Sequence, residues 1–536
     1  MPELTSATQK LIRKYQIWHE SLKPKREVVT IQVDEVASRV ATFYEKIREV
    51  VDWREEHLMR RIAIERILKR RMFLKKNTEN TAEPFVWELI RGGHFPNNKI
   101  PKEKIAKIQK LINKYAFILS GSPLPPKDKT KSEFYTQILE IAACEVEEVL
   151  APYPRLRADA LIEYMEQLMR ERIKIGKKAQ DFAKITEEEK NTQIYIATQQ
   201  ALFKLDSPII SYNLLKRWYP DWSNPSPITL KEITQNIHLI LDNIEKSFSH
   251  PLASKFYKVC ERYDTPCLLL GDVLSQEPTE IEEKIREPEI LERLIKEVYL
   301  KRLKNLKLRV RRAAVYSTMS IFLTKGVLLY AVEIPFAKYV MGQCDRLAEV
   351  ADILVPTFLM ALLVVTIRPP KKKNLQLVIM KAKRYIYKDD KKDVYEIELY
   401  PKRGFIFKVI IGLFYLLSFG LCFGAIFWLL YWLNFPPLSY LIFIIFTSLI
   451  AFTGTKIRQR ARELHVTEER DSFLNFILVP FSLPVIQLGK WLAARWKKYN
   501  IIAVIFNFLI DMPFLIFVEL LEQWRYFIKE KKEEIH

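Results

Sequence analysis

The sequence predicts an all-α fold, with a large cytoplasmic helical domain followed by a polytopic α-helical membrane domain that carries a small cytoplasmic β-hairpin. Two observations indicate this fold class. The apolar runs that are long enough to cross a bilayer all begin after residue 312. Charge is also uneven, since residues 1–300 hold 49 Lys and Arg against 45 Asp and Glu, whereas residues 301–536 hold 36 against 19. The length of 536 residues favours two or more domains.

Residues 1–312 are predicted to form the cytoplasmic domain, either as one unit or as two with a boundary at 206–227. The stretch 34–74 has neither Gly nor Pro, and its apolar residues begin at alternating spacings of four and three, which is typical of a helical hairpin or coiled coil. The further helices, separated by proline- and glycine-marked breaks, are expected at 101–119, 131–150, 157–174, 186–204, 228–248 and 280–312.

A basic stretch in this domain is a candidate surface for binding anionic groups. Its residues are Arg60, Arg61, Arg66, Lys69, Arg70 and Arg71. Such a face attracts the headgroups of an anionic leaflet, and in other proteins the phosphates of nucleic acid. No nucleic-acid signature accompanies it, so we do not expect nucleic acid as a partner. The interpretation that we favour is a solvated helix face, balanced by acidic residues elsewhere in a nearly neutral domain.

The region 313–472 is predicted to cross the membrane four times. Four apolar segments can each span about 30 Å of hydrocarbon, at 313–336, 349–367, 405–433 and 438–454. Twenty-four Lys and Arg lie in the flanks 301–312, 368–404 and 455–472, against two in 337–348 and none in 434–437. Because basic loops stay on the cytoplasmic side, we place the helical domain and both long loops there, in the inner or plasma membrane of the cell.

The loop 368–404 contains the only persuasive strands. Residues 384–388 and 394–399 are rich in aromatic and β-branched side chains, and they flank a polar turn of Asp and Lys residues. An isolated hairpin is marginally stable, so we expect this one to pack on the helical domain or on the membrane surface.

The region 473–536 is predicted to be re-entrant or to lie as an amphipathic helix in the membrane surface. Its first apolar run is short and contains Pro480 and Pro484. The basic residues that follow lie near two tryptophans and suit anionic headgroups; they are Lys490, Arg495, Lys497 and Lys498. A later apolar run, 501–521, could also span, so four and six crossings both stay open.

Two charges inside the apolar segments are the sharpest candidate site. Lys325 lies in the middle of the first segment and Asp511 in the middle of the last, and they would meet at similar depth if both segments span. Such groups usually pair or line a polar cavity, so they form either a structural ion pair or part of an ion path. We expect Glu333, near the end of its segment, to lie in headgroup water. Gly412, Gly420 and Gly424 mark a face for close helix packing.

Catalytic motifs are largely missing from the sequence. Its 13 glycines form no phosphate-binding loop, its seven histidines include no HExxH, and none of its five cysteines forms a CxxC pair. We therefore expect no cofactor, no metal and no catalytic residue.

These observations favour a non-enzymatic membrane platform that recruits an unknown cytoplasmic protein or organises the membrane surface. The bilayer and its anionic headgroups are its expected partners. The alternative is an ion or solute transporter or channel that uses Lys325 and Asp511, and a lipid-modifying enzyme is the third hypothesis.

The predicted topology can be tested by thiol accessibility in sealed vesicles. A cysteine introduced at Lys372 should react from the cytoplasmic side and the native Cys344 from the opposite side, because basic residues concentrate around the former. Reaction of both from one face would overturn the topology.

Overall fold

The structure, a computed structural model, is all-α in character. It describes residues 2–23, 29–33, 56–74, 80–123, 130–177, 185–276, 278–341, 346–365, 370, 372–388, 393–398, 404–466 and 473–499, together with 520, 524 and 527. About 82% of it is helical, with almost no strand, which confirms the all-α part of the predicted fold class.

The helical domain is built from short helices. They are α1 (Ser6–Ser21), α3 (Glu56–Leu74), α4 (Ala82–Arg91), α5 (Glu103–Gly121), α6 (Lys131–Leu150), α7 (Pro152–Arg172), α9 (Glu187–Phe203), α10 (Ser207–Trp218), η1 (Pro220–Ser223), α11 (Pro227–Phe248), α12 (Ala253–Glu261), α13 (Asp264–Gln276) and α14 (Ile281–Ile285). Of these, α1, α6, α9 and α11 begin at a Thr or Ser that caps the first turn. Thr130 and Thr186 each form a capping box with a glutamate three residues later, which sets the starts of α6 and α9.

Five of the six further predicted helices are confirmed within a few residues, as α5, α6, α7, α9 and α11. The sixth, 280–312, is divided, because Pro288 sits in the first turn of a new and much longer helix. The sequence analysis missed α1, α4, α10, α12 and α13. Most of the predicted coiled-coil seam lies outside the described residues.

Two hydrophobic cores share helix α9. One core joins α3, α4, α5, α6, α10 and α11, and the other joins α1, α7, α12, α13 and later parts of the chain. On α9, Ile196 belongs to the first core and Ile194 to the second, while Tyr195 packs against both. The two cores are therefore in contact through a common helix.

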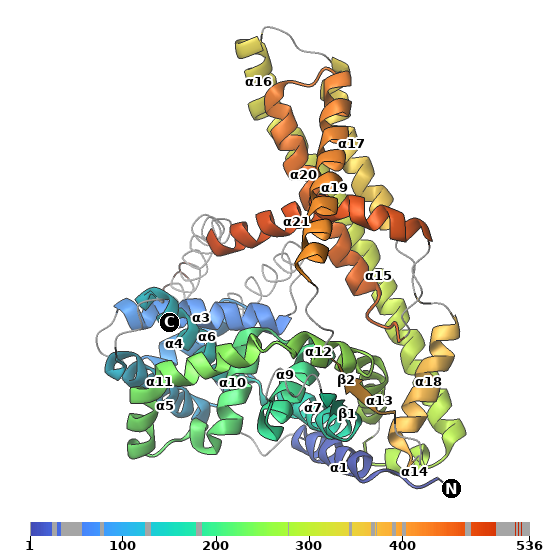
Figure 1. The fold of residues 1–536 in the computed structure, drawn as a ribbon. Helices are drawn as coiled ribbons and strands as arrows, with labels where there is room; N and C mark the ends of the chain where they lie inside the picture. Colours follow the sequence, from blue (N-terminus) through green and yellow to red (C-terminus); the bar gives the residue numbers. More distant parts are fainter. Residues whose placement is uncertain are drawn as a thin grey trace.

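Among the described residues, four helices are long and apolar enough to cross a membrane, as predicted, and we call them the bundle. The first is a continuous rod, Pro288–Tyr339, made of α15 (Pro288–Leu328), η2 (Leu329–Glu333), α16 (Ile334–Phe336) and the start of η3 (Ala337–Met341). The others are α17 (Arg346–Val365), α19 (Phe405–Trp432) and α20 (Pro437–Ala461). At 52 residues the rod is about 78 Å long, and Figure 1 shows it rising from the helical domain to the far end of the bundle.

The loop between α17 and α19 folds into the second core instead of forming the predicted hairpin. Residues 384–386, expected as strand, end the helix α18 (Lys372–Ile386). The strand β2 (Tyr395–Ile397) pairs in parallel with β1 (Ile173–Ile175) of the helical domain. The hairpin prediction was wrong because the aromatic residues at 385–387 suggested a strand, whereas Val378, Ala382 and Tyr385 form a buried helical face.

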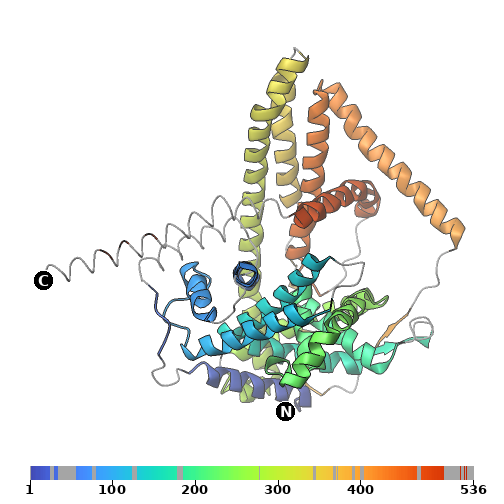
Figure 2. The ribbon, with the colours of Figure 1, turned by 90° about the vertical axis from the view of Figure 1, so that its left-hand side faces the viewer.

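Helix α21 (Phe473–Tyr499) runs across the bundle and packs against both α19 and α20. In Figure 2 α19 leans away from α20, and α21 lies in the opening between them. A side chain at Gly489 would collide with the Ser448 backbone carbonyl, so glycine is required where α21 crosses α20.

The segment that follows α20 is also built into the second core. Leu464 and Val466 are buried there. Asn374 of α18 donates from Nδ2 to the Leu464 carbonyl at 2.6 Å and accepts from the Val466 amide at 3.0 Å. The start of α15, the helix α18 and the segment 464–466 thus all enter one core at one end of the bundle.

Replacing Asn374 by alanine should loosen this attachment. The buried Leu464 carbonyl and Val466 amide would lose their partners, at a cost of about 2 kcal/mol, which corresponds to roughly 30-fold faster amide exchange at Val466. Hydrogen–deuterium exchange of the full chain measures this. Asn236→Ala is the matched control, because that side chain is exposed and bonds only to its own helix. Unchanged exchange at Val466 would contradict the attachment.

Candidate functional site

A buried ion triad joins two helices inside the bundle. The Lys325 ammonium lies 2.6 Å from Glu333 Oε1 and 2.6 Å from Asp352 Oδ2. Lys325 and Glu333 belong to the long rod, and Asp352 belongs to α17. All three side chains are at most 2% exposed, so the ions interact in apolar surroundings where pairing is obligatory.

The local helix geometry brings Glu333 to Lys325. The segment Leu329–Glu333 between them is a π-helical turn, a wider form of helix that occurs often at functional sites. The long lysine side chain extends along the rod, and its ammonium also lies 5.6 Å from the Phe446 ring centre.

The triad extends to a third helix through Ser439, which lies in the first turn of α20. Its hydroxyl donates to Glu333 Oε2, so that Glu333 is held by one cation and one hydroxyl. The rod, α17 and α20 are therefore connected by polar contacts at one depth of the bundle.

The two carboxylates of the triad share only one cation. If all three groups are charged, the triad carries a net charge of minus one. Asp352 Oδ1 is buried and accepts no hydrogen bond from the described residues. Beside it is a cavity of about 20 Å³, lined by Glu333, Asp352, Glu349 and the α19–α20 connection, which is room for one water molecule.

The structure changes the predicted partnership of Lys325. Asp511 lies outside the described residues, and Lys325 contacts Glu333 and Asp352 instead. The expectation that Glu333 lies in headgroup water was wrong, because it is 2% exposed and ion-paired. Sequence reasoning overlooked Asp352, although its place inside the second apolar segment was a usable signal.

A second buried lysine, in the helical domain, shows a fully satisfied arrangement for comparison. Lys114 lies 2.7 Å from both carboxylate oxygens of Glu145, which also accept from Tyr115 and from the Trp222 indole. Burial raises the pKa of Glu145, and these donors oppose that effect. One cation faces one carboxylate here, and both oxygens are partnered, as expected for a structural pair.

Most basic residues of α3 are engaged within the domain. Four of the six form ion pairs: Arg60 with Glu147, Arg61 with Asp206, and Arg70 and Arg71 with Glu88. Lys69 is exposed, and Arg66 is partly buried. The binding of an anionic surface by this helix stays a prediction.

The remaining predicted residues lie on α19 and α21. Lys490 and Arg495 are exposed on α21, whereas the side chains of Lys497 and Lys498 lie outside the described residues. Side chains added at Gly412, Gly420 or Gly424 would meet nothing within 4 Å, so within the described residues no helix packs closely on that face of α19.

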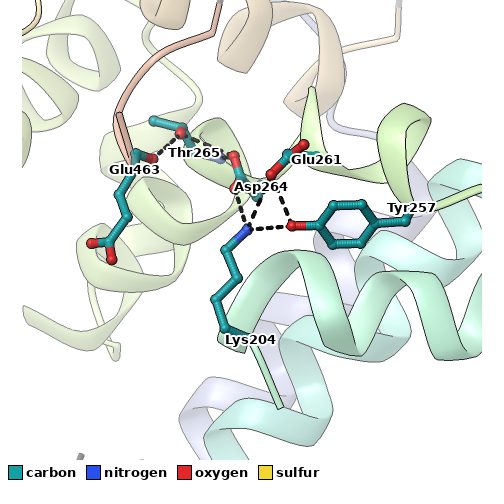
Figure 3. Close-up of polar contacts among 6 residues, drawn as sticks. All are labelled: Lys204, Tyr257, Glu261, Asp264, Thr265 and Glu463. Carbon is teal, nitrogen blue, oxygen red and sulfur yellow. Dashed lines mark hydrogen bonds and ion pairs between the residues drawn. The ribbon is translucent and has the colours of Figure 1, made fainter. Parts of the chain in front are cut away.

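A polar network fastens the end of α20 to the helical domain, as Figure 3 shows. Thr265, in the first turn of α13, donates to the Glu463 carbonyl at 3.0 Å and also to Asp264 Oδ1 at 3.0 Å. Lys204, whose left-handed backbone ends α9, reaches Asp264 and Glu261 at 3.6 Å each. Burial raises the pKa of Asp264 to about 7, so its contribution to stability is greatest at low pH and is lost as the pH rises through 7.

A polar cavity of about 330 Å³ lies between α7, α9 and α10. It is lined mainly by charged residues that pair with one another, such as Arg155 with Asp159 and Arg217 with Glu166. Among the described residues, no three His, Cys, Asp or Glu side chains are grouped to hold a metal ion.

Removing the triad's cation should destabilise the bundle. Lys325→Met leaves two buried carboxylates without a counter-ion, which we expect to cost about 3–5 kcal/mol and to lower the unfolding temperature of the full chain in detergent. Lys338→Met, at an exposed position on the same rod, is the control. Adding Glu333→Gln and Asp352→Asn to Lys325→Met should restore most of the loss. If Lys325→Met unfolds at the same temperature as the wild-type chain, the triad does not stabilise the bundle.

Comparison with known proteins gives no relative from which a site could be transferred. No protein-family model, curated protein or solved structure matches this chain. The buried triad and the attachment of the bundle to the helical domain are therefore the observations on which function is argued.

Proposed function

We propose that this protein is a non-enzymatic platform anchored in a membrane, which holds its helical domain in a set orientation for partner recruitment or for organising the membrane surface. The helical domain and the basic ends of the bundle would face the cytoplasm, since basic flanks stay on that side.

The observation that carries this proposal is the triple attachment of the bundle to one core. Val298 and Leu306 of the rod, Val378 of α18 and Leu464 after α20 are buried together in it. A domain joined by a single flexible linker can turn freely, whereas one built around three ends of a bundle cannot. A set orientation is useful to a protein that presents a surface.

Helix α21 supports the membrane-surface part of the proposal. It crosses the bundle at Gly489, and it exposes Lys490, Trp491 and Arg495. Arg495 lies over the Trp491 ring, 5.7 Å from its centre. Basic residues beside an exposed tryptophan suit the headgroup region of an anionic leaflet.

Charge reversal on α21 tests this role. Lys490→Glu with Arg495→Glu should weaken retention of anionic lipid by the full chain in detergent, by about 1 kcal/mol for each basic residue lost, or roughly 30-fold together, and less at high salt. The control is Lys10→Glu with Arg13→Glu, because both residues are exposed on α1, at the far side of the helical domain in Figure 1. Equal retention by the two double variants would contradict the proposal.

A second candidate function, transport of protons or small ions, is favoured by the triad alone. An excess carboxylate beside a water-sized cavity is the kind of group that lines ion and proton paths. Reconstituted vesicles decide between the two. A platform gives no ion or proton flux above protein-free vesicles, whereas a transporter gives flux that Asp352→Asn abolishes.

A further inference from the structure

We propose that Glu333 and Asp352 together bind one exchangeable proton, taken from water at the end of the bundle away from the helical domain. The site deepens the second candidate function, but proton binding is an equilibrium property. It can therefore be true whether or not the protein transports anything.

The charge balance of the site calls for this proton. The described polar side chains that face it are Lys325 and Glu333 from the rod, Glu349 and Asp352 from α17, and Ser439 from α20. Lysine is the only cation among them. An unpaired carboxylate in apolar surroundings is costly, so uptake of one proton to give a carboxylic acid relieves the excess charge.

The two carboxyl groups are positioned so that one proton can be bound between them. The oxygens paired to Lys325 each lie 2.6 Å from the same nitrogen, so they are no further apart than twice that distance. Two carboxyl groups that are bound to one ammonium therefore lie in contact range of each other. Two carboxylates only accept hydrogen bonds, and such a contact is favourable when one of them carries a proton and donates it.

Asp352 has a carboxylate oxygen, Oδ1, that is available to exchange the proton with water. It is 1% exposed, its Oδ1 has no donor among the described residues, and it lines the 20 Å³ cavity. Glu349 is half-buried at the same cavity and lies three residues before Asp352, nearer the start of α17. The proton moves between water and the carboxylate, and no bond other than the O–H bond forms or breaks.

The test uses dicyclohexylcarbodiimide, an apolar reagent that adds to protonated carboxyl groups in apolar sites. The purified full chain is labelled in detergent from pH 5 to pH 9, and peptide mass spectrometry locates the adduct. We expect labelling at Asp352 or Glu333 that falls about tenfold for each pH unit above the midpoint, as the protonated fraction does. Labelling of neither residue at any pH would overturn the proposal.

Variants distinguish a proton shared by the two carboxyl groups from a fully ionised triad and from a sodium site. Asp352→Asn leaves one carboxylate for one lysine, so labelling at Glu333 should disappear at neutral pH. Lys325→Met removes the cation, so labelling should persist to higher pH. Two results would contradict the proposal that the two carboxyl groups share a proton whose binding depends on Lys325. One is a pH profile of labelling that is unchanged in Lys325→Met, and the other is protection from labelling by sodium at constant pH.

A second measurement avoids any variant that fails to fold. The infrared difference spectrum of the wild-type chain between low and high pH should contain the stretching band of a buried carboxylic acid, shifted in heavy water. Absence of that band would overturn the proposal for the native protein.

Discussion

The continuous helix Pro288–Tyr339 is the constraint on which the rest of the structure depends. Its first turns supply Leu291, Ile295 and Val298 to the core of the helical domain, and its later turns supply Lys325 and Glu333 to the triad. One ladder of backbone hydrogen bonds connects these places, so neither can be arranged independently of the other. The second core, the attachment of α18 and the meeting of three bundle helices all depend on the direction of this rod.

The two buried lysines differ in the number of carboxylates that face each of them. This number distinguishes a structural ion pair from a site that can bind a proton. Lys114 faces a single glutamate whose oxygens are both partnered, so this site carries no excess negative charge. Lys325 faces two carboxylates, one of which keeps an oxygen without a donor beside a cavity. Both sites are nearly inaccessible to solvent, so exposure alone does not distinguish them. The difference lies in the number of carboxylates for each cation.

Much of the fold could be predicted because it depends on local sequence. Apolar length alone located the four bundle helices, and proline- and glycine-marked breaks located α5, α6, α7, α9 and α11 within a few residues. Contacts between distant segments could not be predicted. Tyr385 is of a residue type common in strands, but it lies in the last turn of α18, where its ring stacks on Tyr263 of the helical domain. Lys325 was found because it interrupts an apolar run, whereas its partners depend on how α17 packs against the rod.

The sizes of two cavities among the described residues limit what each of them can bind. The cavity beside Asp352 holds about one water molecule, so it suits a proton and is too small for an organic solute. The cavity between α7, α9 and α10 is about 330 Å³, at the lower end of the range for small-molecule sites, but its lining charges are already paired with one another. The cavity in the bundle therefore fits the proposed proton site. The helical domain shares a core with the start of the rod, with α18 and with the segment after α20, so its orientation relative to the bundle is fixed at three places.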